Sequence, residues 1–360
     1  MNGRQTCLTQ CEAPLPFLVT EPFEKTRNFP DVVNPVFSIE IGLLGAFGRR
    51  ASLPPMIISC GEALIDFLPT KTGETGPAFL ARTGGSLFNV AIAIGRLGSP
   101  AGFYGGLSSD LFGEMLKAAL AASSVDASFA TLTDRPTTLA FVTFSGSDAR
   151  YAFFDEGSAG RMLSEADLPA FPKTVSALHF GSFSLAEEPC GSTLEALMLR
   201  EFADRVISLD LNIRPTLIRN RDGYLARIER LIAMSDIIKL SSEDLDWLGE
   251  TADAVAARWL KHSGKLVLVT RGAEGATAAT ARGRIDVAAR RVKVADTVGA
   301  GDTFSAGFLS ALEKRGLLTK AAVAKLDDAA LSAALDFAAR AAAITVSRPG
   351  ADPPWLHELE

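Results

Sequence analysis

The stretch Asp296-Thr-Val-Gly-Ala-Gly-Asp302-Thr-Phe-Ser-Ala-Gly-Phe-Leu309 decides the fold of this sequence. A β-rich run, Ile285–Val294, precedes it and an apolar, helix-forming run follows it. Gly299, Ala300 and Gly301 therefore fall where a helix should begin. Because backbone N–H groups at a helix start lack partners and the helix dipole adds positive charge there, this turn predicts a site for an anion such as phosphate.

Asp302 is unusual in an anion site. A carboxylate repels a phosphate that only has to be held, but it can take the proton from a hydroxyl group that attacks the phosphate. Asp302 therefore predicts a phosphotransferase in which it is the catalytic base. Two common phosphate-binding motifs are ruled out: Phe304 stands where G-x-G-x-x-G needs its last glycine, and no G-x-x-x-x-G-K-[ST] occurs in the sequence.

The composition excludes several other classes of protein. Among 360 residues, 36 basic side chains face 42 acidic ones, for a net charge of −6 without basic runs, which argues against a nucleic-acid partner. No uninterrupted apolar segment reaches the ~18–20 residues that cross a bilayer, so we expect no membrane partner. The four cysteines, Cys7, Cys11, Cys60 and Cys190, lack zinc-site pairing and favour reduced thiols in a cytoplasmic protein.

The chain divides near Met56. Residues 1–55 are interrupted by proline and lack sustained periodicity, so we expect an N-terminal extension that is poorly ordered and dispensable, without a signal peptide. From residue 56 to residue 360, strands alternate with helices, which predicts one α/β domain with a mostly parallel sheet covered on both faces. The expected strands are Met56–Asp66, Val206–Leu211, Asp236–Leu240 and Lys265–Thr270, and the expected helices are Ser192–Ala203, Ser242–Leu248, Ala252–His262 and about Asp328–Thr345.

Two segments have the residue pattern of antiparallel strands instead. Thr137–Phe154 contains two β-rich runs around a Ser-Gly-Ser-Asp turn, which indicates a hairpin. Together with Phe67–Thr83, it is expected to form a small β-lid over the active edge of the sheet, with lid segments at about 67–83 and 137–156.

Polar residues at predicted strand ends and in one apolar helix are candidate ligands. Asp66, at the expected end of the first strand, either accepts two hydroxyl groups of a sugar or caps the next turn. Asn89 lies in the apolar run Gly84–Gly98 and either braces nearby backbone or binds a hydroxylated ligand, since a buried amide needs partners. Asn212 and Arg214 have the reach to contact a phosphate or the acceptor, unless Asn212 only forms a turn.

Two signatures, Gly84–Gly98 and Asp296–Gly307, occur in this order with the strand-end residues between them. From about Met56 to its end, the chain resembles the ribokinase family of carbohydrate kinases, the phosphofructokinase-B type. The resemblance implies transfer of the γ-phosphate of ATP to a hydroxyl group of a sugar or nucleoside. It also implies a ribokinase-like three-layer αβα domain with a β-lid that often mediates dimerisation, so a homodimer through the lid is expected.

The resemblance also implies roles for individual residues. Asp302 looks like the catalytic base and Gly299, Ala300 and Gly301 like the anion hole. The implied sugar ligands are Asp66, Gly85 and Asn89. The implied ATP contacts are Thr270, Gly272 and Gly275, with Asn212 and Arg214 near the phosphates.

Metal sites are implied by the resemblance as well. Members of the family are often activated by a monovalent cation such as K⁺, which here would involve Asp296, Val298 and the loop Ser347–Gly350. The family's N-x-x-E stretch, which organises Mg²⁺ through water, is matched by Ser241-Ser-Glu243-Asp244, so either Glu243 or Asp244 would serve. Leu87-Phe88 stands where Pro or small residues are frequent and is expected to alter the sugar pocket.

The substrate is predicted less directly. Asp210-Leu-Asn-Ile-Arg-Pro and the run Tyr151–Leu163 look most like fructokinase-type members, which implies fructose and its primary hydroxyl group. Arg150, on the lid, either reaches the substrate or is solvated. An arginine also suits the carboxylate of 2-keto-3-deoxygluconate, so a 2-keto-3-deoxygluconate kinase or a ribokinase is the alternative. A non-catalytic sugar-binding pseudokinase is a remote one, because both the base and the anion hole are present.

Overall fold

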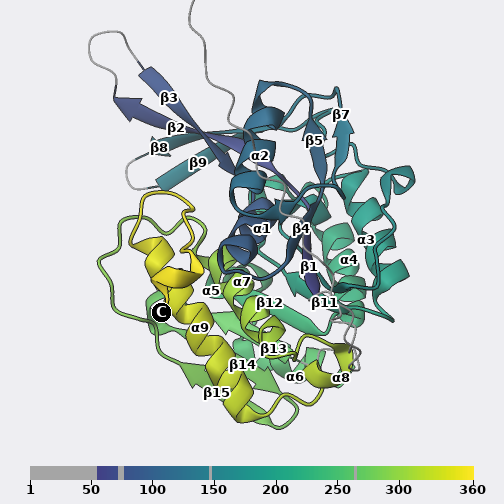
Figure 1. The fold of residues 1–360 in the computed structure, drawn as a ribbon, viewed down its shortest axis with the longest axis vertical. Coiled ribbons are helices and arrows are strands. Elements are labelled where there is room, and N and C mark those ends of the chain that lie inside the picture. The colour runs from purple at the N-terminus through teal and green to yellow at the C-terminus, as the bar shows by residue number, and fades with distance from the viewer. Residues whose placement is uncertain (1–54, 72–76, 146–147, 263–265) are drawn as a thin grey trace, which may run out of the picture. The chain divides into compact units, whose positions relative to one another are not determined.

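A nine-stranded, mostly parallel sheet organises the described part of the chain (Figure 1). The structure, a computed structural model, describes residues 55–71, 77–145, 148–262 and 266–360. The expected extension, with Cys7 and Cys11, therefore lies outside the described residues. The spatial order of the strands is β15 (Gly283–Val287), β14 (Ala276–Thr280), β13 (Leu266–Thr270), β12 (Ile237–Ser241), β11 (Val206–Asp210), β10 (Val175–Gly181), β1 (Met56–Cys60), β4 (Ala101–Tyr104) and β6 (Val125–Asp126).

Near one edge of this sheet, β14 pairs antiparallel with both of its neighbours, β13 and β15, and the other described strand pairs are parallel. The parallel strands are short apolar runs because both of their faces are buried. Helices cover the two faces, as expected for a three-layer αβα domain. Their bounds are α1 (Ser86–Arg96), α2 (Leu111–Ala122), α3 (Cys190–Glu201), α4 (Arg221–Met234), α5 (Ser242–Leu248), α6 (Ala252–His262), α7 (Ala300–Glu313), α8 (Lys320–Val323) and α9 (Asp328–Val346).

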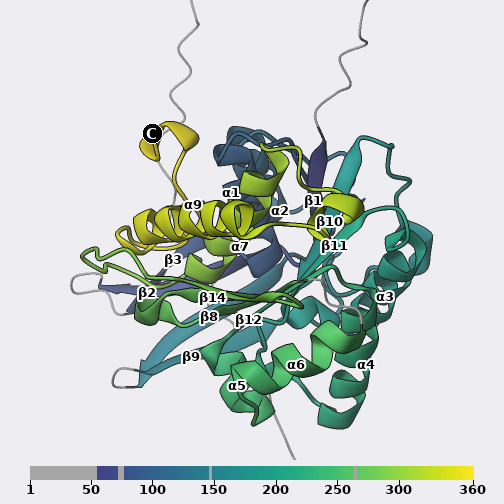
Figure 2. The same cartoon turned by 90° about the horizontal axis from the view of Figure 1, so that it is seen from below.

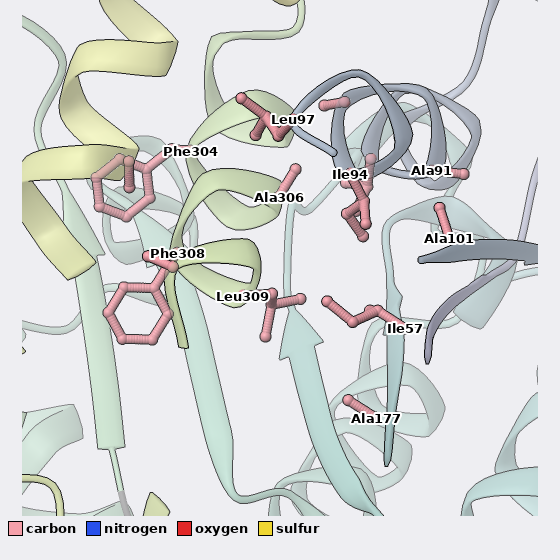
Figure 3. Close-up of a cluster of buried hydrophobic side chains, with 14 of the residues drawn as sticks. Ile57, Ala91, Ile94, Leu97, Ala101, Ala177, Phe304, Ala306, Phe308 and Leu309 are labelled. Atoms are coloured by element: carbon pink, nitrogen blue, oxygen red, sulfur yellow. The ribbon is translucent and has the colours of Figure 1, made fainter. Parts of the chain in front are cut away.

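Alternate residues of each strand enter different cores. Ile57 packs in one cluster with side chains of α1, α2, α7 and α9, whereas Ile58 packs in another with side chains of α3, α4, α5 and α6. Figure 2 shows α7 and α9 on one side of the sheet and α5 and α6 on the other. This first cluster contains Ile57, Ile94 of α1 and Leu309 of α7, which Figure 3 shows between the two helices and the sheet. This packing fixes α1 and α7 side by side over the central strands.

Helix α9 is the one described helix that is long and apolar enough to cross a membrane by length and composition. Its apolar run is not uninterrupted, since it contains Asp336 and Arg340. Leu331, Leu335 and Ala338 of α9 are buried in the same core cluster as α7. The helix therefore serves as a core helix here.

The expected lid is a separate four-stranded sheet, in the order β3-β2-β8-β9. Figure 1 shows these strands together at the upper left, apart from the large sheet. Strands β2 and β8 are parallel, and each pairs antiparallel with its other neighbour. The strand bounds are β2 (Leu64–Lys71), β3 (Pro77–Gly84), β8 (Thr138–Ser145) and β9 (Asp148–Phe154).

The expected first strand is wrong in its extent, because it ends at Cys60 and not at Asp66. A Cβ atom at Gly61 would lie 2.7 Å from Leu87 Cγ, so the chain passes close to α1 here and turns away from the sheet. Strand β2 then begins at Leu64. Asp66 therefore belongs to the lid and not to the edge of the large sheet.

The run Ile285–Val294 is only partly a strand, since β15 ends at Val287. Beyond it, Val292 and Val294 are exposed, because no further strand covers this edge. Helices α5 and α6 have the expected bounds, whereas Lys265 lies outside the described residues. The remaining short elements are β5 (Gly106–Ser108), which pairs with β7 (Thr131–Thr133), and the 3-10 helices Glu165–Asp167, Phe183–Leu185, Pro215–Leu217, Gly272–Glu274 and Leu356–Glu358.

Candidate active site

The first turn of α7 holds Asp302 in a buried, fully partnered position. Its side chain is 8% exposed. Ser86 Oγ donates a hydrogen bond to Asp302 Oδ1 over 2.6 Å, and Asn89 Nδ2 donates one to Oδ2 over 2.9 Å. Both donors lie on α1, whose packing against α7 therefore orients the predicted base. The side chain of Asn89 therefore holds the predicted base in place, and not the nearby backbone.

Asn212 and Arg214 join the same network. Asn212 Nδ2 donates to Ser86 Oγ over 2.8 Å, and Arg214 Nη1 donates to Asn212 Oδ1 over 2.6 Å. The hydroxyl group of Ser86 thus links the loop after β11 to Asp302. Asn212 has a φ of 38°, a strained value for a residue other than glycine, so the loop holds it in place against a local preference.

Glu62, which sequence reasoning did not single out, caps helix α1 from a distance. The N-cap residue is Gly85, which has no side chain to accept a hydrogen bond. Glu62 Oε1 accepts one from the Ser86 amide over 3.1 Å, and Oε2 accepts one from the Ser184 hydroxyl group. Burial raises the pKa of Glu62, and its hydrogen-bond donors lower it. A Cβ atom at Gly85 would lie 2.8 Å from the Glu62 carbonyl oxygen, so only glycine allows this close approach.

Leu87 and Phe88 do not line a sugar pocket. Each is 1% exposed. Phe88 packs edge-on against Phe103 with ring centroids 6.1 Å apart, inside the core of the large domain. The larger side chains at these two positions therefore fill the core beneath α1.

The predicted anion hole is the N-terminus of α7. Gly299 is its N-cap with a φ of 75°, and a Cβ atom there would lie 2.6 Å from Ala351 Cβ. Both observations require glycine at this position. The first backbone N–H groups of the helix lie in the turn that carries Asp302, so an anion and the carboxylate share one end of α7.

A buried ion pair lies behind this turn. Lys239 of β12 is 4% exposed, and its Nζ is 2.9 Å from Asp210 Oδ2 on β11. Ser305 of α7 donates to the same Asp210 oxygen over 3.1 Å. A Cβ atom at Gly301 would lie 3.1 Å from Lys239 Nζ. Sequence reasoning missed this pair, although a lone lysine in the apolar run Ile237–Leu240 was a signal for a buried charge with a partner.

Burial raises the pKa of Asp302 above its ordinary value. The hydrogen bonds from Ser86 and Asn89 lower it, Asp210 raises it and Lys239 lowers it. The net effect is a carboxylate that is more basic than an exposed one, which improves a general base.

Asp66 comes from the lid, where β2 pairs with β3 and β8. Its carboxylate lies against Gly84, since a Cβ atom there would be 2.2 Å from Asp66 Oδ2. Burial raises the pKa of Asp66 to about 6. Within the described ranges, no donor forms a hydrogen bond with this carboxylate, which leaves it available to a ligand. Arg150 lies in β9 opposite Thr143, so its backbone is also part of the lid sheet.

The predicted ATP contacts lie at the ends of neighbouring strands. Thr270 ends β13 in register with Ser241, which ends β12. Gly272 has a φ of 50° and open space around it. A Cβ atom at Gly275 would lie 2.0 Å from the Val287 carbonyl oxygen of β15, so the fold itself requires glycine at this position. The structure thus places Thr270 and Gly272 at the carboxyl edge, where open α/β sheets bind ligands.

Glu243 and Asp244, the two candidate residues for Mg²⁺, differ in their exposure and in their hydrogen-bond partners. Asp244 is 2% exposed, and it accepts hydrogen bonds from the amides of Ser241 and Ile213. It forms a capping box with Ser241, so the residues that match the ends of N-x-x-E partner each other. Glu243 is exposed, and a hydrogen bond from its own amide lowers its pKa.

Asp296 brings two loops together. Its Oδ1 accepts from the Val298 amide over 3.1 Å, and its Oδ2 accepts from the Gly350 amide over 2.8 Å. The segment before the anion hole is thereby tied to the loop after α9. These are the two segments that the family resemblance implies for a monovalent cation.

The structure thus combines a three-layer αβα fold, a small separate sheet and a buried carboxylate in the first turn of α7, as expected for a kinase of small hydroxylated molecules. The chain belongs to the pfkB family of carbohydrate kinases, whose model matches residues 55–358.

Individual relatives are similar over most of their length. A fructokinase from Rhizobium leguminosarum bv. trifolii is 54% identical over 280 residues, which are 77% of this chain and 85% of that protein. The structure of a fructokinase from Xylella fastidiosa with bound ATP has a TM-score of 0.79 at 31% identity and covers 85% of this chain and 97% of that one. A fructokinase double mutant from Vibrio cholerae O395, in its fructose-, ADP- and potassium-bound form, has a TM-score of 0.73 at 27% identity and covers 84% and 95%.

Proposed function

We propose that this protein is an ATP-dependent fructokinase, which transfers the γ-phosphate of ATP to the primary hydroxyl group of fructose. The observation that carries this proposal is the position of Asp302 at the start of α7, where Ser86 and Asn89 orient its two oxygens. The fructokinases to which the chain is similar support fructose as the acceptor.

In the proposed reaction, ATP binds along the carboxyl edge near Thr270 and Gly272, with its γ-phosphate at the amides of Gly299–Gly301. The sugar hydroxyl group attacks the phosphorus atom in line as Asp302 accepts its proton. The bond between the γ-phosphorus and the bridging oxygen breaks, and ADP leaves with that oxygen. The helix amides stabilise the charge on the transferring group because they are already oriented toward it.

The sugar is held between the lid and α1. Asp66 accepts hydrogen bonds from two sugar hydroxyl groups. Asn89 donates its Nδ2 to the base, which leaves its Oδ1 as an acceptor for another hydroxyl group. Gly85 brings the backbone of the α1 start close to the sugar, and Arg150 is placed by β9 on the same lid. Arg214 reaches the phosphates through the loop that Asn212 anchors. Closure of the lid excludes water and limits hydrolysis of ATP.

Two metal ions fit residues on this edge. Glu243 is exposed and ionised, so we assign it to Mg²⁺ through water, in preference to Asp244. In the described residues no group of three or more His, Cys, Asp or Glu side chains could hold a metal ion. Mg²⁺ keeps several waters and binds with substrate phosphates, so a single carboxylate such as Glu243 would hold it through water. Oxygens of Asp296, Val298 and Gly350 would hold K⁺, which supplies fixed positive charge beside the anion hole.

The lid also supports a homodimer. Phe67 and Phe141 stack with ring centroids 4.6 Å apart, and Phe79 and Phe154 pack edge-on against Phe141 on the same face. Phe79 is 40% exposed and Phe154 is 60% exposed. A second copy of the chain would cover these rings. The cytoplasm is the location that suits the free, buried thiols of Cys60 and Cys190.

An assay of ADP release over fructose, 2-keto-3-deoxygluconate and ribose, each with and without K⁺, tests the proposed function. Fructose should give the highest kcat/KM by tenfold or more, a difference of about 1.4 kcal/mol in transition-state binding. A preference for 2-keto-3-deoxygluconate or ribose would assign the chain to those kinases. Sugar binding without ADP release would indicate a pseudokinase.

The role of the base is tested by Asp302→Asn. Turnover should fall about 10²-fold or more, because the variant cannot accept the proton. Binding of ATP, measured by calorimetry, and the unfolding temperature should stay close to those of the wild type. A variant that keeps near-normal turnover would refute Asp302 as the base.

A further inference from the structure

The Lys239–Asp210 pair is a buried charge cluster without a role in the reaction described above. Both side chains are almost inaccessible, at 5% and 2% exposure. A buried pair gives no clear advantage in stability over apolar side chains of similar volume, because both ions lose their hydration. Apart from Ser208 and the terminal Ser241, the other residues of these two strands are apolar. A structural role alone therefore explains this pair poorly.

The pair is also incompletely satisfied. In the described ranges, Lys239 Nζ donates one hydrogen bond, to Asp210 Oδ2, although an ammonium group has three N–H bonds. Asp210 Oδ1 is buried and has no hydrogen-bond partner. Pairs that serve stability alone are usually saturated with hydrogen bonds. The pair thus holds the positive charge of Lys239 in place, while hydrogen bonds compensate that charge only in part.

The position of Lys239 relates this charge to the active site. Its Nζ lies against the backbone of Gly301, where a Cβ atom would be only 3.1 Å away. Gly301 is in the first turn of α7 and precedes Asp302 directly. The ammonium group therefore lies beside the first turn of α7, next to the residue that precedes Asp302.

We propose that Lys239 is a positioning residue for phosphoryl transfer: its ammonium group, held by Asp210 behind Gly301, stabilises the negative charge that gathers at the start of α7. That charge is carried by the ionised Asp302 and by the transferring phosphoryl group. The inference rests on the proposed function, in which Asp302 is the base and Gly299–Gly301 receive the γ-phosphate.

Other titratable groups lie around this pair and around Asp302. They are His179 on β10, Asp244 on α5, Asp302 on α7 and, on the far side of Asp302, Glu62. Burial lowers the pKa of Lys239, but the carboxylates of Asp210 and Asp244 raise it, and the result is above its ordinary value. Burial and Lys239 lower the pKa of His179 to about 3. Lys239 is therefore charged and His179 neutral throughout the pH range of an assay.

Lys239 and Asp210 shift the pKa of Asp302 in opposite directions. Lys239 lowers the pKa of Asp302 and Asp210 raises it. Removing the ammonium group should move the acid limb of the kcat–pH profile to higher pH, because Asp302 must be ionised to accept a proton. Removing the Asp210 charge should move that limb to lower pH. A purely structural pair predicts neither shift.

The experiment compares the wild type with Lys239→Met, Asp210→Asn and the double variant, using kcat–pH profiles with fructose and ATP. Lys239→Met should lower kcat at least tenfold, which corresponds to about 1.4 kcal/mol, and should move the acid limb of the kcat–pH profile to higher pH. Asp210→Asn should move the acid limb to lower pH. The double variant leaves no unpaired buried ion, so it should fold. Its acid limb should lie near the pH of the wild-type limb, while its kcat should stay below that of the wild type.

Two outcomes separate this inference from the proposed function. Acid limbs that coincide in all folded variants, with wild-type kcat in the double variant, would overturn the role of Lys239. Asp302→Asn in the same assay tests the base independently. If Asp302→Asn keeps normal turnover, the proposed function fails; if Asp302→Asn is inactive but the pair variants are normal, only the role of Lys239 fails.

Discussion

At the scale of single residues, Asp66 is a carboxylate whose burial lowers the stability of the folded protein at neutral pH. Burial raises its pKa to about 6, and no donor in the described ranges compensates its charge. The folded state therefore holds the proton of Asp66 more tightly than the unfolded chain does. Its contribution to stability is full below the ordinary pKa of 3.8 and is lost as the pH rises through about 6.

Asp66→Asn should consequently stabilise the free protein above pH 6. A shift of about two pKa units corresponds to roughly 3 kcal/mol at most, so the variant should gain about 1–3 kcal/mol at pH 8 and little near pH 4. The KM for fructose should rise roughly 10- to 100-fold, because hydrogen bonds to a charged acceptor are lost. Urea unfolding at both pH values, with steady-state kinetics, measures these effects.

Asp204→Asn is the matched control, because Asp204 is exposed and precedes β11 at the opposite edge of the sheet. It should leave both the unfolding free energy and the KM unchanged. If Asp66→Asn is instead less stable than the wild type at pH 8, the carboxylate has an internal partner and is not waiting for a ligand.

The sequence singled out Asp302, Asn89 and Asn212, because each is a polar residue in a stretch whose pattern is otherwise apolar or glycine-rich, and the structure brings the three into one hydrogen-bond network. It did not reveal Ser86, although this hydroxyl group joins Asp302 to Asn212. A serine at a helix start is common, and its partners lie 216 and 126 residues away in the sequence. Contacts at such separations depend on the packing of α1 against α7, which periodicity does not encode.

At the scale of elements, the buried strands β11, β12 and β13 were predicted close to their bounds, whereas the equally buried β4 and β10 were not predicted. Short apolar runs such as Leu266–Thr270 have no competing interpretation in an alternating α/β pattern. The run Ile285–Val294 also alternates, but no strand lies beyond β15 to pair with its second half. The break between β1 and β2 was missed because Met56–Asp66 is apolar almost throughout, and only the contact of Gly61 with Leu87 ends the first strand.

The lid sheet has two different apolar faces. Leu64, Ala140 and Phe153 pack with Phe183 and Leu217 of the large domain, whereas Phe67, Phe79, Phe141 and Phe154 form an aromatic cluster on the other face. Exposed aromatic rings that already pack against one another present a preformed surface, which suits association between copies.

Phe154→Glu should therefore convert the expected dimer into a monomer, because a carboxylate would be buried without a partner in the interface. Light scattering coupled to size-exclusion chromatography measures the mass. Leu199→Glu on α3 is the control, since Leu199 is 63% exposed and lies outside the lid. A wild type that is monomeric at micromolar concentration, or a Phe154 variant of unchanged mass, would contradict a lid-mediated dimer.

At the scale of the whole molecule, β1 is the position from which the domain is built. It lies between β10 and β4 and brings Ile57 into one core and Ile58 into the other. The match to the family begins at residue 55, one residue before this strand. Both observations support Met56 as the start of the catalytic domain.

A variant that lacks residues 2–55 should keep kcat and KM within about twofold of the full chain, because β1 and all proposed site residues remain. Thermal unfolding should stay within a few degrees. Removing residues 2–60 is the matched control: it also deletes β1, whose loss exposes both cores, and should prevent folding. A shorter variant that loses activity while remaining folded would show that residues 2–55 take part in function.

Asp66 and the backbone of Arg150 belong to the lid, whereas Asp302 and the Lys239–Asp210 pair belong to the large domain. The lid therefore supplies part of the proposed sugar site, while α1 supplies Asn89 and the large domain supplies the phosphate chemistry. We expect substitutions along the lid strands to change the accepted sugar while the phosphate chemistry persists.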